Sequence, residues 1–209
     1  MHEDSNDNSS VLSPEAQAGL ALWQQASSFQ ELCELMACFV EGTCKYSPGY
    51  TAEDLDEESE PLVEYLAALN RAGFLTECSQ PGLDVGHSKQ RAFVTGFAFE
   101  AVAVQIEKLS LTTDLYVCVS RPGYINGCRM PVTLDMFKAF TWAGDNPIDE
   151  ETGSFLELVH FEADCGPLAF HELLQACYIS VIDLCWGRED YLWQELAKAL
   201  CFSLEPRNA

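Results

Sequence analysis

Residues 167–202 read PLAFHELLQACYISVIDLCWGREDYLWQELAKALCF, and this stretch indicates the fold class. Residues 167–176 predict a helix, and residues 177–183 form a nearly continuous apolar run that is typical of a buried strand. After a short loop, residues 190–202 predict an amphipathic helix, because four large side chains recur on one face: Leu192, Trp193, Leu196 and Leu200. Helix, strand and helix in close succession predict an α/β (or α+β) fold with some parallel strand pairing.

The middle of the chain adds further strands to this unit. Apolar and β-branched residues predict strands at 74–78, 92–99, 114–120 and 155–160, with one or two more within 130–141. Residues 99–109 predict a helix, because Val102, Ile106 and Leu109 share one face. We therefore expect a single mixed sheet flanked by helices.

The region before the first strand predicts helices only. Ser13, Pro14 and Glu15 are typical of a helix start, and this first helix extends to about Ala26. A second helix follows Ser27 or Ser28 and ends at Gly42, and a third ends at residues 72–73. We expect a disordered acidic segment at 1–12 and a single domain at 13–205, divided into a helical part, 13–73, and a sheet-containing part, 74–205.

The chain is strongly acidic, with 33 Asp and Glu against 11 Lys and Arg, which gives a net charge of −22. Because 48% of the residues are hydrophobic, the composition argues against a disordered acidic tail. The scarcity of cations argues against direct nucleic-acid binding, since phosphates are bound by Lys and Arg. Residues 1–64 hold 14 of the acids and one base, so the charge concentrates in an acidic N-terminal helical lobe.

The densest run of charge predicts a surface for a basic protein partner. Its carboxylates are Glu53, Asp54, Asp56, Glu57, Glu58 and Glu60. An acidic face attracts basic proteins and steers their association. The alternative interpretation is an ordinary solvated loop or helix entry.

The ten cysteines indicate a reducing compartment rather than a disulfide framework. Most lie in apolar runs, where Cys behaves as a small buried hydrophobe. No Cys-x-x-Cys pair is present, so neither a metal site nor a cofactor is predicted. The first residues lack a basic start and an apolar run, and no apolar stretch is long enough to cross a membrane. We expect an intracellular protein.

Three segments carry a family resemblance. They are residues 68–76 (ALNRAGFLT), the pair 79–82 (SQPG) and 90–97 (QRAFVTGF), and residues 179–188 (ISVIDLCWGR) with Leu192-Trp193. Together they resemble a family of uncharacterised proteins, mainly from actinobacteria with viral relatives, that is catalogued as a domain of unknown function. The resemblance covers about residues 20–200 and implies domain extent but no reaction, and the chain departs from the family in its cysteine richness and in residues 121–153.

The first of these segments ends in a candidate ligand site at residues 76–82. Thr76, Ser79 and Gln80 supply hydroxyls and an amide where loops at strand ends gather binding groups, and Arg91 can add a charge. This set suits a neutral or anionic small ligand. Equally, the same side chains can cap a helix end and hold a structural turn.

A second candidate site lies at residues 186–190, between a strand and a helix, where a helix N-terminus attracts anions. Glu189 and Asp190 would repel an anion there, so Asp190 is expected to cap the helix instead. The chain lacks a Gly-x-Ser-x-Gly turn and a phosphate-binding glycine loop, and no Cys and His are singled out as a catalytic pair. The acids Asp145, Asp149 and Glu150 match no calcium-loop spacing.

Two functional hypotheses follow. The first is an interaction protein that binds a basic protein partner, including the special case of a viral or mobile-element counter-defence factor whose carboxylates imitate DNA phosphates. The second is a small-molecule-binding or catalytic α/β domain that uses Thr76, Ser79, Gln80 and Arg91. A further alternative assigns the motif to folding alone and places the function in residues 121–153.

Overall fold

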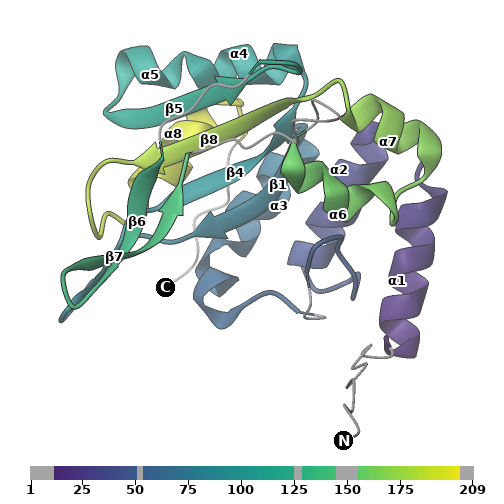
Figure 1. The fold of residues 1–209 in the computed structure, drawn as a ribbon, viewed down its shortest axis with the longest axis horizontal. Helices are drawn as coiled ribbons and strands as arrows, with labels where there is room; N and C mark the ends of the chain where they lie inside the picture. Colours follow the sequence, from purple (N-terminus) through teal and green to yellow (C-terminus); the bar gives the residue numbers. More distant parts are fainter. Residues whose placement is uncertain (1–11, 51–53, 125–128, 145–154, 203–209) are drawn as a thin grey trace, which may run out of the picture.

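The computed structural model describes residues 12–50, 54–124, 129–144 and 155–202. Several sequence predictions lie outside the described residues: the disordered segment up to residue 11, Glu53 of the acidic run, and the acids at 145–150. Within the described ranges, helices and two β-sheets form one packed body (Figure 1). The expected combination of helices and sheet is therefore confirmed.

The helical N-terminal part begins where the sequence predicts. Helix α1 spans Pro14–Gln25, and the Ser13 side chain caps it by accepting a hydrogen bond of 3.0 Å from the Ala16 N–H. Helix α2, Phe29–Val40, has the same device in Ser28, whose hydroxyl accepts from the Glu31 N–H. A 3₁₀ helix η1, Glu57–Leu62, leads directly into α3, Val63–Arg71.

The first sheet has four strands in the order β1-β4-β8-β5. Their bounds are Phe74–Gln80, Phe93–Ala98, Cys177–Asp183 and Leu115–Ser120, and every pairing is antiparallel. Helices α4, Glu100–Glu107, and α5, Leu109–Thr112, precede β5, and α8, Tyr191–Ala199, follows β8. All seven residues of β8 are buried, because this strand lies in the interior of the sheet.

The second sheet is smaller and also antiparallel, in the order β2-β3-β6-β7. Its strands are Leu83–Val85, Ser88–Gln90, Met130–Asp135 and Lys138–Ala143. Figure 1 shows the hairpin of β6 and β7 at one end of the long axis of the molecule, with α1 at the other end. The prediction of one or two strands within 130–141 is confirmed as this hairpin.

The expectation of one mixed sheet with parallel pairs differs from this arrangement. The apolar run of β8 has another cause, since the sheet is covered on both faces. Ile179 and Val181 face a core built with α3, α4 and α8, whereas Tyr178 faces a core built with α1, α2 and α7, the helix Pro167–Leu173. Burial on two faces makes a strand continuously apolar whichever way its neighbours run.

The strand predicted at 155–160 was wrong. The structure has a 3₁₀ turn, Leu156–Leu158, followed by the short helix α6, Val159–Glu162. Phe155, Leu158 and Phe161 are buried three residues apart, which is the spacing of a helical turn, whereas Val159 is exposed. The alternation in the sequence therefore reflected one buried side chain per turn rather than two strand faces.

The nine cysteines in the described ranges are free thiols. Within these ranges, no group of three or more His, Cys, Asp or Glu side chains is arranged to hold a metal ion. None of the helices that the structure describes is long and apolar enough to cross a membrane.

Candidate functional site

Thr76 lies inside β1 and is held by Asn70 at the end of α3. The Thr76 N–H donates to Asn70 Oδ1 (2.9 Å), and Asn70 Nδ2 donates to Thr76 Oγ1 (2.8 Å) and to the Leu66 carbonyl (2.8 Å). Asn70 is fully buried and Thr76 is nearly so. The hydrogen bonds between Asn70 and Thr76 therefore join the last turn of α3 to β1, which is a structural role.

Gln80 connects the two sheets. Its Nε2 donates to the carbonyls of Arg91 (2.9 Å) and Val132 (3.0 Å), and its Oε1 accepts from the Thr133 hydroxyl (2.9 Å). Gln80 ends β1 in the first sheet, and Val132 and Thr133 belong to β6 in the second. Both amide protons of the side chain are therefore used within the protein.

Arg91 lies between β6 and the loop that follows β8. Its Nη1 donates to the Pro131 carbonyl (2.9 Å), and its guanidinium carbon lies 4.1 Å from the centre of the Trp186 ring. Burial lowers the pKa of Arg91, and the carboxylate of Asp183 partly opposes that effect. Its Nε is buried, and no hydrogen-bond partner for this atom is found within the described ranges.

The second candidate segment, residues 186–190, packs against the region of Gly82 and Gln90. Arg188 forms two hydrogen bonds of 2.6 Å with the fully buried carboxylate of Asp183 and one of 2.9 Å with Asp114, and its guanidinium covers the Tyr191 ring at 3.8 Å. These contacts lower the pKa of Asp114 through the hydrogen bond from Arg188. Asp190 occupies the N-cap position of α8, but its side chain caps no backbone N–H.

Two glycines allow the segments to meet. A Cβ at Gly82 would lie 2.4 Å from the Arg188 carbonyl oxygen, and one at Gly187 would lie 2.5 Å from the Asp84 Cβ. Gly187 also has a φ of +72° and donates its N–H to the Gln90 carbonyl (2.9 Å). The sequence predicted residues 76–82 with Arg91 and residues 186–190 as separate sites, whereas the structure packs residues 79–91 against residues 183–190 in one interlocked region.

No cavity found among the described residues is lined by all four predicted ligand residues. A small space of about 20 Å³ borders Thr76 and Ser79, enough for about one water molecule, and Gln80 and Arg91 do not line it. Ser79 is half-buried on β1, whereas Arg91 lies beyond the end of that strand against Trp186. The structure therefore brings Gln80 and Arg91 together through a backbone contact and leaves Thr76 and Ser79 apart from them.

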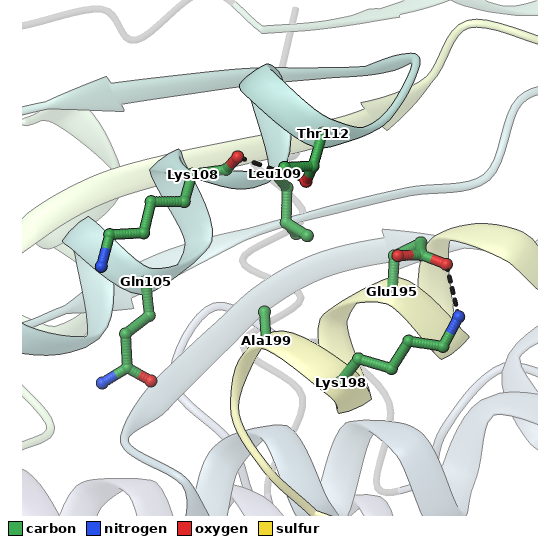
Figure 2. A pocket seen from close by; sticks show the side chains of 7 residues that line it. All are labelled: Gln105, Lys108, Leu109, Thr112, Glu195, Lys198 and Ala199. Atoms are coloured by element: carbon green, nitrogen blue, oxygen red, sulfur yellow. Dashed lines mark hydrogen bonds and ion pairs between the residues drawn. The ribbon is translucent and has the colours of Figure 1, made fainter.

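A larger cavity of about 320 Å³ lies between α4–α5 and α8. Figure 2 shows its lining: Gln105, Lys108, Leu109, Thr112, Glu195, Lys198 and Ala199. The Lys198 ammonium pairs with Glu195 at 2.6 Å, and the Lys108 ammonium points the other way (Figure 2). Because its two cations diverge, the cavity does not present a converging set of groups to a ligand.

The acidic run is displayed on η1. Asp54 pairs with Lys45, whereas Asp56, Glu57, Glu58 and Glu60 are exposed, and no ion pair of these four is found in the part of the chain that the structure describes. Glu58 accepts a hydrogen bond of 3.3 Å from the neutral amide of Gln90.

The pKa of Tyr50 is affected by the negative charge beside this segment. Burial raises its pKa to about 12, and the nearby carboxylates of Asp56, Glu77 and Glu58 act in the same direction. Three acids therefore lie close to one phenol at the edge of η1.

Most cations elsewhere are neutralised by acids of this chain. Arg71 pairs with Glu34 and Glu41, and Arg121 pairs with Glu100 and Glu107. Lys89, Arg188 and Lys198 have acidic partners as well. The cations therefore compensate acids next to them and leave the carboxylates of η1 uncompensated.

One exposed surface was not identified from the sequence. The hairpin of β6 and β7 exposes Met136, Phe137, Phe140 and Trp142. A sequence signal for this surface was present. Residues 135–138 (DMFK) form the turn between the two strands, and they lack the Gly or Asn that such a turn favours.

A comparison with curated proteins finds no significant match. A family model matches residues 19–203, which is nearly the whole chain and agrees with the extent that the sequence motifs indicated. The chain belongs to the family described as Domain of unknown function (DUF6919).

Proposed function

We propose that this protein is an interaction protein that docks a basic protein surface on the acidic segment η1. The observation that carries the proposal is the set of four exposed carboxylates within residues 56–60, at the start of η1, for which no cationic partner is found among the described residues. Such a set attracts a basic surface over several ångströms and weakens with salt.

The local structure holds the backbone that carries these four carboxylates in a fixed conformation. Ser59 and Leu62 are buried and anchor one side of η1, and Pro61 restricts its backbone. In a 3₁₀ helix, residues three apart lie above one another, so Glu57 and Glu60 share one side. A partner would therefore meet preorganised carboxylates, which lowers the entropic cost of binding.

The small-molecule alternative has weaker support. Gln80 uses both of its amide protons within the protein, and Thr76 is held by Asn70. These bonds suit a structural role for the motif. Ligand binding at Thr76, Ser79, Gln80 and Arg91 stays a prediction, which a thermal-shift screen of nucleotides and metabolites tests with Gln80→Ala and Arg91→Ala as controls.

The experiment for the acidic segment compares two variants of equal charge. One carries Asp56→Asn, Glu57→Gln, Glu58→Gln and Glu60→Gln. The matched control carries Glu15→Gln, Glu162→Gln, Glu189→Gln and Asp190→Asn, four exposed acids on other elements. Proteins captured from a lysate by the wild type and the control, released by salt and lost with the η1 variant support the proposal. Equal capture by both variants contradicts it.

A narrower form of the proposal is DNA mimicry by a viral or mobile-element counter-defence factor. In that case the captured partner is itself a DNA-binding protein, and duplex DNA competes with this chain for it. A partner that binds DNA and this protein simultaneously excludes the narrower form and leaves the basic-partner proposal standing.

A further inference from the structure

The hairpin of β6 and β7 presents large apolar side chains to solvent. Residues 129–143 are called the arm below. Met136 is 65% exposed, Phe137 70% and Phe140 73%, and Trp142 is 44% exposed. The contacts of these rings are few: Phe137 meets the His87 ring at 5.5 Å, and Arg129 lies 5.3 Å from the Trp142 ring. Large apolar side chains exposed together on one hairpin are typical of a contact surface.

The tip of the arm is also conformationally strained. Met136 has a φ of 48° and Phe137 a φ of 63°, so both occupy the left-handed region in the turn between Asp135 and Lys138. Two-residue hairpin turns with this geometry favour Asn and Gly, because a bulky side chain is disfavoured there. Met136 and Phe137 therefore weaken the hairpin, and their exposure shows that they contribute little to the core.

Strand addition to β7 is disfavoured, although β7 is the edge of its sheet. Thr133 pairs with Thr141 and Leu134 with Ala139, which leaves Phe140 as the extra residue of a bulge. Bulges and edge lysines such as Lys138 are devices that block a further strand. A partner of the arm would therefore bind side chains rather than extend the sheet.

Charge favours a second copy of this chain at the arm. The strands of the second sheet hold two bases (Lys89 and Lys138) and two acids (Asp84 and Asp135), a balance of zero in a chain of −22. The arm also lies at the opposite end of the long axis from α1 (Figure 1). Two copies in contact through their arms would meet where the strands carry no net charge, which avoids the repulsion that a contact between acidic surfaces would cause.

The tip also has the self-complementarity that a twofold contact needs. Asp135 and Lys138 flank the turn and are both exposed, and no ion pair or hydrogen bond of either side chain is found within the described ranges. In a twofold dimer, a contact between residue 135 of one copy and residue 138 of the other occurs twice. Free charges of opposite sign on either side of an apolar tip fit that requirement.

We propose that the arm is a homodimer contact, in which two copies pack Met136, Phe137 and Phe140 tip to tip. Lys138 of each copy then faces Asp135 of the other. This contact is separate from the acidic segment η1.

The first test is the double variant Met136→Asn, Phe137→Gly, analysed by sedimentation across the micromolar range. Asn-Gly suits the turn, so the variant is expected to unfold at the same temperature or higher. We expect the wild type to dimerise and the variant to be monomeric. A wild type that stays monomeric throughout, or a variant that dimerises as strongly as the wild type, overturns the proposal.

The second test exchanges the charges. Lys138→Glu and Asp135→Lys should each weaken self-association by about tenfold, because each places like charges together twice. Mixing the two single variants should restore a heterodimer by native mass spectrometry, and the double variant D135K/K138E should restore the homodimer. Absence of the heterodimer in the mixture overturns the assigned pairing. The four-residue η1 variant should dimerise like the wild type, so this proposal and the proposed function fail separately.

Discussion

The fully buried carboxylate of Asp183 is held by Arg188, from which it accepts two hydrogen bonds of 2.6 Å. Asp183 ends the central strand β8, and Arg188 lies five residues later in the loop before α8. The ion pair between Asp183 and Arg188 therefore holds the loop against the end of β8. The same guanidinium reaches Asp114 beside β5, which joins the loop to the neighbouring strand.

Replacing Arg188 with Met should lower the free energy of unfolding by about 3 kcal/mol, because it leaves the buried Asp183 carboxylate without its cation. Urea denaturation measures the loss. Lys198→Met is the control, since Lys198 forms an exposed pair with Glu195 and should cost less than about 1 kcal/mol. Equal losses in the two variants would show that Asp183 does not depend on Arg188.

Replacing Gln80 with Ala should destabilise the protein by about 3 kcal/mol. The change removes three hydrogen bonds and leaves the carbonyls of Arg91 and Val132 with fewer donors. Hydrogen exchange should show faster opening of the second sheet than of β8, since Gln80 joins the sheets. The exposed Gln30 provides the control, and Gln30→Ala should change stability by less than about 0.5 kcal/mol. An unaltered exchange pattern in Gln80→Ala would contradict the role as a connector.

Gly82→Ala should cost about 2 kcal/mol, because the new Cβ collides with the Arg188 carbonyl oxygen. Both residues act on one loop, so the variant combined with Arg188→Met should lose less than the sum of the two single losses. Gly123→Ala is the comparison: it has a φ of +79° and open space around it, and its loss should add to that of Arg188→Met. Additive losses for Gly82→Ala would show that Gly82 and the loop are energetically independent.

The pair of Arg71 and Glu41 predicts a pH-dependent contribution to stability. Hydrogen bonds from Arg71 lower the pKa of Glu41 below its ordinary value of 4.5. A depressed carboxyl pKa stabilises the fold above its ordinary value, and the contribution is lost as the pH falls through the lowered value. Wild type should therefore exceed Arg71→Met in free energy of unfolding by roughly 0.5 kcal/mol at neutral pH, and the gap should close as the pH falls below 4.5 through the lowered pKa of Glu41. A gap that persists in acid would assign the loss to packing of the Arg71 side chain.

Local patterns predicted the elements well where a single residue decides them. Ser13 predicted the start of α1, and its hydroxyl indeed caps that helix. The apolar run at 177–183 predicted β8, and residues 114–120 predicted β5. The prediction of secondary structure failed where packing against other elements decides which side chains are buried. Residues 155–160 were predicted as a strand, but the buried side chains Phe155, Leu158 and Phe161 are spaced three apart, because each packs once per helical turn.

The candidate site illustrates the same division. Thr76, Ser79, Gln80 and Arg91 were selected as polar residues near a strand end, whereas Thr76 lies inside β1, and the partners of these side chains could not be predicted. Val132 and Thr133, which bind Gln80, lie more than fifty residues along the chain in the other sheet. Whether an amide faces a ligand or a carbonyl depends on that long-range pairing.

The amino-acid sequence by itself determined the charge imbalance, the helix starts, the apolar strands and the family match over residues 19–203. These properties depend on residue type and on neighbours a few positions away. Only the tertiary structure decided that the strands form two antiparallel sheets, that residues 79–91 interlock with 183–190, and that η1 and the arm are exposed. The reason is physical: strand direction, hydrogen-bond partners and exposure depend on contacts between distant segments, which form only when the chain packs.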